Sequence, residues 1–234
     1  METISLNGRW NMCGNGYDCS GSIPGSVYSF LLDGNLMDDP YYRDNEWGAL
    51  ELLNHDYTFS RSFKFKKKSD DKRLLLRCEG LDTLSEIKIN GKFIASTKNM
   101  HRTYEFDVTN VLKNGSNKIE ITFFSPNKYI KEKYEKEKLF SPPDALMGYM
   151  HLRKSHGMFG WDWGARLPDA GIWRDISIVR ENSARIQDVR ITQRHSCGRV
   201  FVNVCAECSG NADIKIDVTA PDGEKFVLKN NTET

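Results

Sequence analysis

The chain has 234 residues, of which 39% are hydrophobic and 11% aromatic, enough for one large domain with a real core or for one and a half smaller ones. Its 33 basic and 32 acidic residues leave a net charge of +1, which argues against nucleic acid or anionic lipid as a partner. No apolar run reaches transmembrane length, and the first residues, METISLNGRWNM, lack a signal-peptide pattern, so we expect no membrane association and a cytoplasmic location.

A two-residue hydrophobic period runs through the first two thirds of the chain. Residues 57–65, YTFSRSFKF, place four aromatic rings on one face and polar side chains on the other, which predicts a half-buried strand. Asn90-Gly91 separates two short apolar strands, a pattern typical of a type I′ hairpin. Residues 103–108, 118–125 and 172–179 alternate in the same way, and we expect Trp10 and Trp173 to lie in the core. Many short strands joined by turns predict an antiparallel sandwich or jelly roll.

One segment breaks this period. Residues 127–140, NKYIKEKYEKEKLF, carry Ile130 and Tyr134 four apart among charged residues, which predicts a short helix on the surface. Pro142-Pro143 would end it. The following stretch, 141–171, has no regular period, and long irregular segments inside compact domains are often functional.

Alternation resumes after Arg180. About four strands are expected between 183 and the end, with a Pro-Asp-Gly turn at 221–223, against the roughly seven strands of an immunoglobulin-like sandwich. We therefore predict two domains: residues 1–182, and residues 183–234 as the start of an immunoglobulin-like sandwich that is incomplete.

Six cysteines are scattered along the chain. Without a secretory signal, reduced thiols are the default. Cys205 and Cys208 form a C-x-x-C motif near Cys197 and His195, which raises the possibility of a zinc site. The second C-x-x-C pair of a zinc ribbon is missing and Cys205 lies within an alternating strand, so we expect no metal ligand among them.

The most informative short stretch is FGWDWG, residues 159–164. Tryptophan faces stack on the C–H faces of sugars, and a carboxylate accepts hydrogen bonds from hydroxyl groups. Glycines on both sides allow tight turns. The pattern fits a carbohydrate-binding surface, but it fits equally a loop in which one tryptophan caps the sandwich and Asp162 pairs with Arg153 or Arg166.

Several motifs in one order resemble a known family. They are LNGRW, IPGSVYSFLLDGNLMDDPYYRDNEW, YTFSRSF, GLDTLSEIKINGK, HRTYEFDVTNVLKNGSNKIEITFFSP and HLRKSHGMFGWDWGARLPDAGIWRDISI. Together they resemble the N-terminal region of family 2 glycoside hydrolases, and DDPYYRDNE and RKSHGMFGWDWGARLPDAGIWR are closest to the β-mannosidase branch. The resemblance is dense over residues 6–180 and only architectural beyond.

The resemblance implies an all-β fold, a galactose-binding-like jelly-roll domain followed by the start of an immunoglobulin-like domain. In this family a barrel further along the chain supplies two glutamates for retaining hydrolysis of a terminal β-mannoside, without a cofactor or metal. The Trp-Asp-Trp loop of the first domain shapes the pocket for the terminal sugar. Trp161 and Asp162 would then bind substrate, with Trp163 packed behind them and Arg153 in a supporting role.

No catalytic residue is expected within these 234 residues. Asn45-Glu46 imitates a catalytic Asn-Glu pair but matches the family's first-domain DNE stretch instead. The chain alone should therefore be inactive. The alternatives are a free-standing carbohydrate-binding module that uses Trp161, Asp162 and Trp47, a family 2 hydrolase for galactose or glucosamine, and a plain interaction domain with both loop tryptophans buried.

Overall fold

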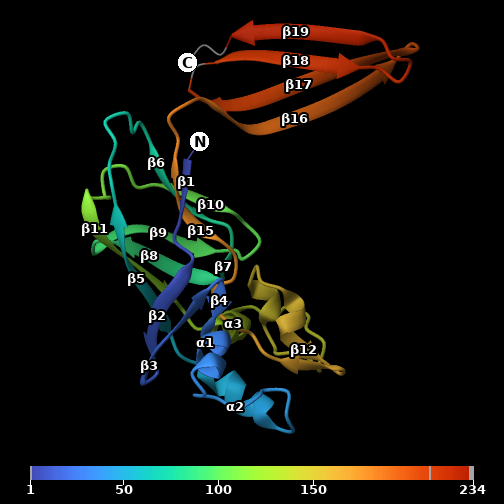
Figure 1. Ribbon diagram of the computed structural model, residues 1–234. Helices are drawn as coiled ribbons and strands as arrows, with labels where there is room; N and C mark the ends of the chain where they lie inside the picture. The colour runs from blue at the N-terminus through green and yellow to red at the C-terminus, as the bar shows by residue number, and fades with distance from the viewer. Residues whose placement is uncertain (1, 211, 232–234) are drawn as a thin grey trace. The chain divides into compact units, whose positions relative to one another are not determined.

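The computed structural model describes residues 2–210 and 212–231. They form two compact units, and the chain passes from the first to the second between Arg180 and Glu181. The first unit is a β-sandwich with helices at one end, and the second contains two β-hairpins (Figure 1). Each unit is described separately below.

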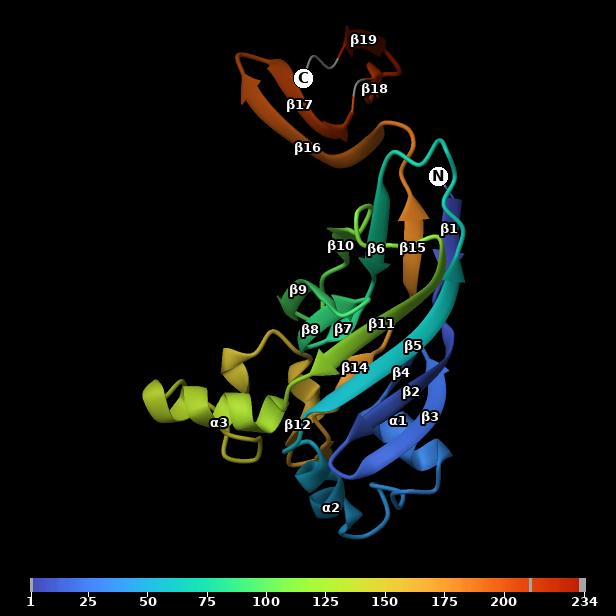
Figure 2. The same ribbon diagram turned by 90° about the vertical axis from the view of Figure 1, so that its left-hand side faces the viewer.

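The first unit contains two large sheets in which all neighbouring strands are antiparallel. One has the order β1-β15-β6-β10, with bounds Glu2–Ser5, Ile176–Arg180, Leu74–Cys78 and Tyr104–Asp107. The other has the order β3-β2-β5-β11-β8-β9, with bounds Tyr17–Ile23, Gly8–Gly14, Tyr57–Phe65, Gly115–Phe123, Leu84–Ile89 and Lys92–Lys98. Figure 2 shows the long strands β5 and β11 side by side in the second sheet.

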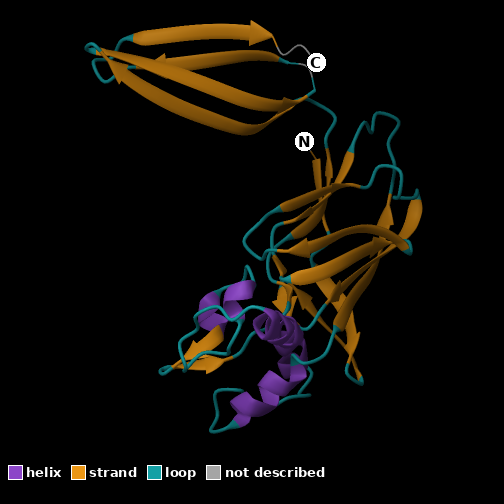
Figure 3. Ribbon diagram, turned by 180° about the vertical axis from the view of Figure 1, so that it is seen from behind, coloured by secondary structure: helices purple, strands orange, loops and turns teal. Residues whose placement is uncertain are grey.

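Short strands and helices cover one end of the sandwich. Three two-residue strands form a small sheet of order β4-β14-β7, with bounds Gly25–Ser26, Gly171–Ile172 and Leu81–Asp82. The helices are α1 (Val27–Asp33), α2 (Asn45–Leu52) and α3 (Pro126–Lys136), with 3-10 turns at Tyr149–His151 and His156–Met158. Figure 3 shows that the helices gather at this end.

The core lies between the two large sheets. One continuous cluster of buried side chains includes Leu76 and Ile178 from the first sheet and Phe59 and Ile121 from the second. Phe30 of α1 packs edge-on against Phe59 at 5.0 Å between ring centroids, so this helix belongs to the same core. The sandwich is therefore held mainly by burial of alternating apolar residues.

The expected periodicity is confirmed where it was strongest. Tyr57, Phe59, Phe63 and Phe65 are buried along β5. Asn90 and Gly91 form the turn between β8 and β9, with φ of 53° and 77°, the two positive values that a type I′ turn requires. These results confirm the predicted all-β sandwich.

The helices were predicted only in part. The helix expected at 127–140 is α3, which starts at Pro126 and buries Ile130. Helix α1 was missed: Ser26 caps it in a capping box with Ser29, but it has only seven residues, too few for the helical spacing of its buried Val27, Phe30 and Leu31 to stand out in the sequence. No helix in the described part of the chain is long and apolar enough to cross a membrane.

Of the two tryptophans expected in the core, Trp10 is 1% exposed and donates from Nε1 to Leu6 O at 2.8 Å. Trp173 is only half-buried: it covers Gly80 on one side, and the guanidinium of Arg174 lies over its ring at 4.1 Å. It sits in the turn before β15 rather than in a strand, so its position in the core was wrongly predicted.

The second unit consists of β16 (Arg185–Ser196) paired with β17 (Arg199–Ser209), and β18 (Asp213–Thr219) paired with β19 (Lys225–Asn231). The four strands are those expected from the alternation. Cys205 and Cys208 are three apart on β17, so their side chains point to opposite faces. The described residues contain no group of three His, Cys, Asp or Glu side chains that could hold a metal ion.

Candidate functional site: a Trp-Asp-Trp hairpin

The stretch around FGWDWG is a small hairpin rather than an irregular loop. Strand β12 (Phe159–Trp161) pairs with β13 (Gly164–Arg166), and Asp162 and Trp163 form the turn between them. The hairpin escaped prediction because its strands have three residues each, too few for a two-residue period to be visible. The irregular segment predicted from 141 to 171 is therefore corrected at 159–166, while 141–148 and 167–170 contain no helix or strand.

The two tryptophan rings lie side by side and reach solvent. Trp161 is 39% exposed and Trp163 81% exposed, with ring centroids 5.4 Å apart and planes inclined by 48°. Trp163 is the more exposed of the pair, so the expectation that it packs behind Trp161 and Asp162 is wrong for these residues. The exposure also contradicts the alternative in which both tryptophans are buried.

Asp162 lies at the tip of the hairpin and is exposed. Among the described residues its carboxylate has no hydrogen-bond or ion-pair partner, and neither Arg153 nor Arg166 pairs with it. An unpaired carboxylate beside two exposed aromatic rings can accept hydroxyl hydrogen bonds while the rings stack on a sugar face. This is the chemistry of carbohydrate recognition.

Arg166 ties the base of the hairpin to α2. Its Nη1 lies 3.1 Å from Glu46 Oε1, its Nη2 donates to Asp144 O at 2.9 Å, and its guanidinium lies 5.5 Å from the ring centre of Trp47. Glu46 is therefore engaged in an ion pair. Sequence reasoning did not connect Arg166 with the DNEW stretch, because 120 residues separate the two partners.

Arg153 does not reach the hairpin tip. Its main chain forms an isolated bridge with Asn99, its carbonyl accepts from Met100 N at 3.0 Å, and its side chain is exposed. Arg153 was expected to support Asp162, but within the described residues no contact joins the two side chains. The side chain of the next residue, Lys154, is the one that is buried.

A small core of its own holds the hairpin from below. Phe159 is fully buried and stacks on Tyr149 at 5.6 Å, within a cluster that also contains Ile130 of α3 and Leu152. Leu146 N donates to Phe159 O at 2.9 Å. The strand that leads to the exposed tip thus begins at a buried, packed residue.

Charged side chains lie at both ends of the segment 154–169, next to the small sheet β4-β14-β7. Lys154 is 2% exposed; its Nζ donates to the carboxylate of Asp82 and, at 2.7 Å, to the carbonyl of Asp169. Burial lowers the pKa of the Lys154 ammonium, while the neighbouring Asp82 opposes the shift. Burial raises the pKa of Asp169 to about 6, although Ser26 and two main-chain N–H groups donate to its carboxylate.

Gly160 lies where the backbone of β12 passes close to the side chain of Arg166. Its φ is +90°, and a Cβ at this position would lie 2.5 Å from Cγ of Arg166. We expect Gly160→Ala to destabilise the unit by about 1–3 kcal/mol, because the backbone would be strained and Arg166 displaced. Denaturant unfolding followed by tryptophan fluorescence measures this.

Gly157 is the matched control for that substitution. It lies three residues earlier, has no positive φ, and a Cβ there meets nothing within 4 Å. Gly157→Ala should change the free energy of unfolding by less than about 0.5 kcal/mol, or increase it slightly. Equal losses in the two variants would show that the Arg166 contact and the backbone at Gly160 do not matter.

The fold defines a class of domain: an antiparallel β-sandwich that carries, at one end, a hairpin with two exposed tryptophans and an unpaired aspartate. The family model described as "Glycosyl hydrolase 2 galactose-binding domain-like" matches residues 10–174. The chain belongs to this family, as the sequence motifs predicted.

Its relatives include known β-mannosidases. The chain is 35% identical over 193 residues to a β-mannosidase of Capra hircus, an alignment that covers 78% of this chain and 22% of the relative. The crystal structure of a β-D-mannosidase from Dictyoglomus thermophilum superimposes with a TM-score of 0.77 at 27% identity, covering 99% of this chain and 31% of that one. An exo-chitosanase from Amycolatopsis orientalis shares the fold at a TM-score of 0.61 and 13% identity, over 99% of this chain and 27% of that one. The chain thus spans about a fifth of the length of the curated β-mannosidases it matches, and 27–31% of these two solved structures.

Proposed function

We propose that this chain is the non-catalytic N-terminal part of a retaining exo-β-mannosidase, and that its Trp-Asp-Trp hairpin forms part of the pocket for the terminal, non-reducing β-D-mannose. The observation that carries the proposal is the hairpin itself, which presents an unpaired carboxylate, Asp162, beside the exposed rings of Trp161 and Trp163. The β-mannosidase names of the relatives in mammals and in Dictyoglomus support mannose over other sugars.

The roles follow from the chemistry of each group. The face of Trp161 would stack on the C–H face of the sugar, and Asp162 would accept hydrogen bonds from its hydroxyl groups. A hydrogen bond to a charged group contributes about 1.5–3 kcal/mol, enough to select the orientation of one sugar ring. Trp163, the more exposed of the two tryptophans, would contact either the sugar or the domain that completes the pocket.

Hydrolysis itself would be carried out elsewhere in the longer protein. Retaining hydrolysis uses two carboxyl groups about 5 Å apart, one as acid and base and the other as nucleophile. At this end of the sandwich Asp162 stands at the hairpin tip, while Glu46 is held by Arg166 at 3.1 Å. The acid and the nucleophile would therefore both come from the rest of the longer protein.

The test is the hydrolysis of aryl β-glycosides by this chain and by the longer protein. The substrates are the β-mannoside, β-galactoside, β-glucosaminide and β-glucuronide. We expect this chain to be inactive on all four, and the longer protein to prefer the mannoside. Hydrolysis by this chain alone would contradict the non-catalytic role, a preference for another sugar would contradict the mannose assignment, and a longer protein that binds mannosides without cleaving them would favour a binding module.

A further inference from the structure

We propose that Lys154 is a positioning residue: its buried ammonium closes the base of the segment 154–169 and thereby fixes the Trp-Asp-Trp hairpin. We call the bonds from Lys154 to Asp169 and Asp82 the clamp. The clamp is a property of this chain, whereas its effect on hydrolysis rests on the proposed function. The first observation is where the bonds go. Lys154 stands at one end of the segment, and its Nζ donates to the carbonyl of Asp169, at the other end, at 2.7 Å.

The same ammonium attaches this closed segment to the sandwich. Its second acceptor is the carboxylate of Asp82, the last residue of β7, which pairs with Gly171 of β14. Thr83 Oγ1 donates to the other carboxylate oxygen of Asp82, so the acceptor is itself held. Both ends of the segment are therefore joined to one point in the small sheet β4-β14-β7.

Asp169 extends the clamp to α1. Its Oδ1 accepts from Tyr28 N at 3.2 Å, in the first turn of the helix, and from Ala170 N at 2.7 Å. The carbonyl of the same residue is the acceptor for Lys154. A shift of the Lys154 end would thus have to move either Asp169 or β7.

Energetics favour a positioning role over a purely stabilising one. The Lys154 side chain is 0% exposed and that of Asp82 5% exposed, so both charges have lost their hydration. An apolar pair of similar volume often gives equal or greater stability at such a position, whereas three donors on one ammonium can fix several elements at defined angles. Displacement of a substrate-binding group by about 1 Å can lower turnover about 100-fold.

The first experiment is hydrogen–deuterium exchange on this chain, with Lys154→Met compared against Arg180→Met. Arg180 is the matched control, because it too is a buried cation paired with a buried aspartate, Asp71, but it lies at the far end of β15. We expect Lys154→Met to accelerate exchange across residues 156–168 at least tenfold relative to β5 and β11. Arg180→Met should leave that ratio unchanged.

The double variant Lys154→Met/Asp82→Asn covers the case in which an uncompensated Asp82 charge prevents folding. It removes both charges and should show the same selective acceleration at 156–168. Unchanged exchange in this segment, or equal acceleration throughout the unit in both Lys154→Met and Arg180→Met, would overturn the clamp.

The second experiment measures kcat/KM of the longer protein on an aryl β-mannoside, well below its melting temperature. Lys154→Met should lower kcat/KM at least tenfold, and Arg180→Met less than twofold at a comparable loss of thermal stability. Faster exchange at 156–168 with unchanged kcat/KM would overturn the positioning role in hydrolysis. Failure of the unmodified longer protein to cleave mannosides would instead count against the proposed function, and the exchange result would stand by itself.

Discussion

Asp162→Ala in the longer protein should lower kcat/KM on an aryl β-mannoside about 100-fold. The carboxylate is exposed at the hairpin tip and unpaired within the described part of the chain, so its hydrogen-bonding capacity is available to sugar hydroxyls. A 100-fold loss is about 2.7 kcal/mol, which lies within the roughly 1.5–3 kcal/mol that one hydrogen bond to a charged acceptor contributes. Steady-state kinetics gives the value directly.

Two further variants make that result specific. Asp162→Asn keeps the shape but loses the charge, and should reduce kcat/KM by about tenfold, since a neutral acceptor forms weaker hydrogen bonds. Asp70→Ala removes an exposed aspartate in the turn before β6 and should have no effect. Full turnover by Asp162→Ala would remove the role assigned to this residue.

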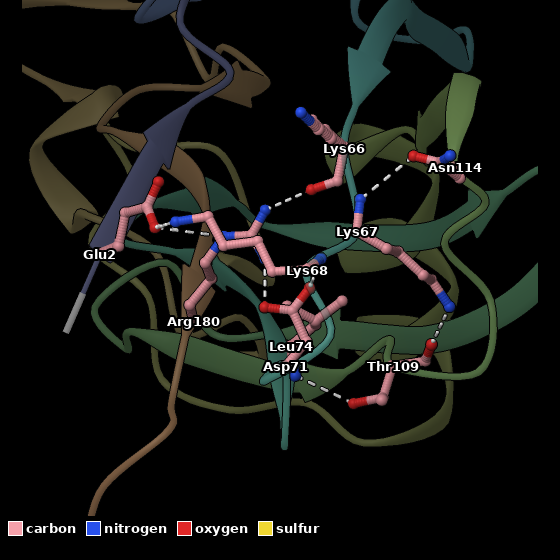
Figure 4. A network of polar contacts seen from close by, with 9 residues as sticks. All are labelled: Glu2, Lys66, Lys67, Lys68, Asp71, Leu74, Thr109, Asn114 and Arg180. Carbon is pink, nitrogen blue, oxygen red and sulfur yellow. Dashed lines mark hydrogen bonds and ion pairs between the residues drawn. The ribbon is translucent and has the colours of Figure 1, made fainter.

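Arg180→Met should lower the free energy of unfolding of the first unit by about 3–5 kcal/mol at pH 7, because it leaves a buried carboxylate without its partner. Arg180 is 3% exposed, pairs with Asp71, whose side chain is 6% exposed, and donates to Lys66 O at 2.6 Å (Figure 4). Its guanidinium also lies 4.7 Å from the ring centre of Phe65. All five tryptophans lie in this unit, so their fluorescence reports its unfolding.

The pH dependence of this loss has a definite sign. Burial opposes ionisation of Asp71, but hydrogen bonds from Arg180 and Lys68 outweigh it, so the pKa of Asp71 lies below its usual value. A depressed pKa contributes stability above the unfolded-state value, near pH 4, which is lost as pH falls through the folded value. The deficit of Arg180→Met should therefore shrink below about pH 4. A loss under 1 kcal/mol at pH 7, or one that grows in acid, would contradict the account.

Local patterns predicted what local sequence determines. The alternation at 57–65 and the Asn90-Gly91 turn specify their structures within a few residues, and both are present as expected. The helix at 127–140 was found because its polar and apolar residues repeat over several turns, and it ends at Lys136. Helix α2 was missed because only Ala49 is buried along it, so no apolar face marks it in the sequence.

The residue types of Trp161 and Asp162 fit sugar recognition and a plain structural loop equally well, and only the resemblance to family 2 glycoside hydrolases singled them out for substrate binding. Both side chains are exposed, but the contacts that support them are known only from the structure. Arg153 was chosen for its nearness in sequence, whereas the contacts that support the hairpin join Arg166 to Glu46 and Lys154 to Asp82. Such pairs lie far apart along the chain, and a lysine in a surface-like sequence gives no sign that it will be buried.

The most direct test of the central claim is a crystal structure of the longer protein with a mannose-configured inhibitor in its pocket. We predict that a carboxylate oxygen of Asp162 lies within about 3.2 Å of a hydroxyl oxygen of the sugar, and that the Trp161 ring faces the sugar. A terminal mannose bound with no contact to residues 161–163 would contradict the claim.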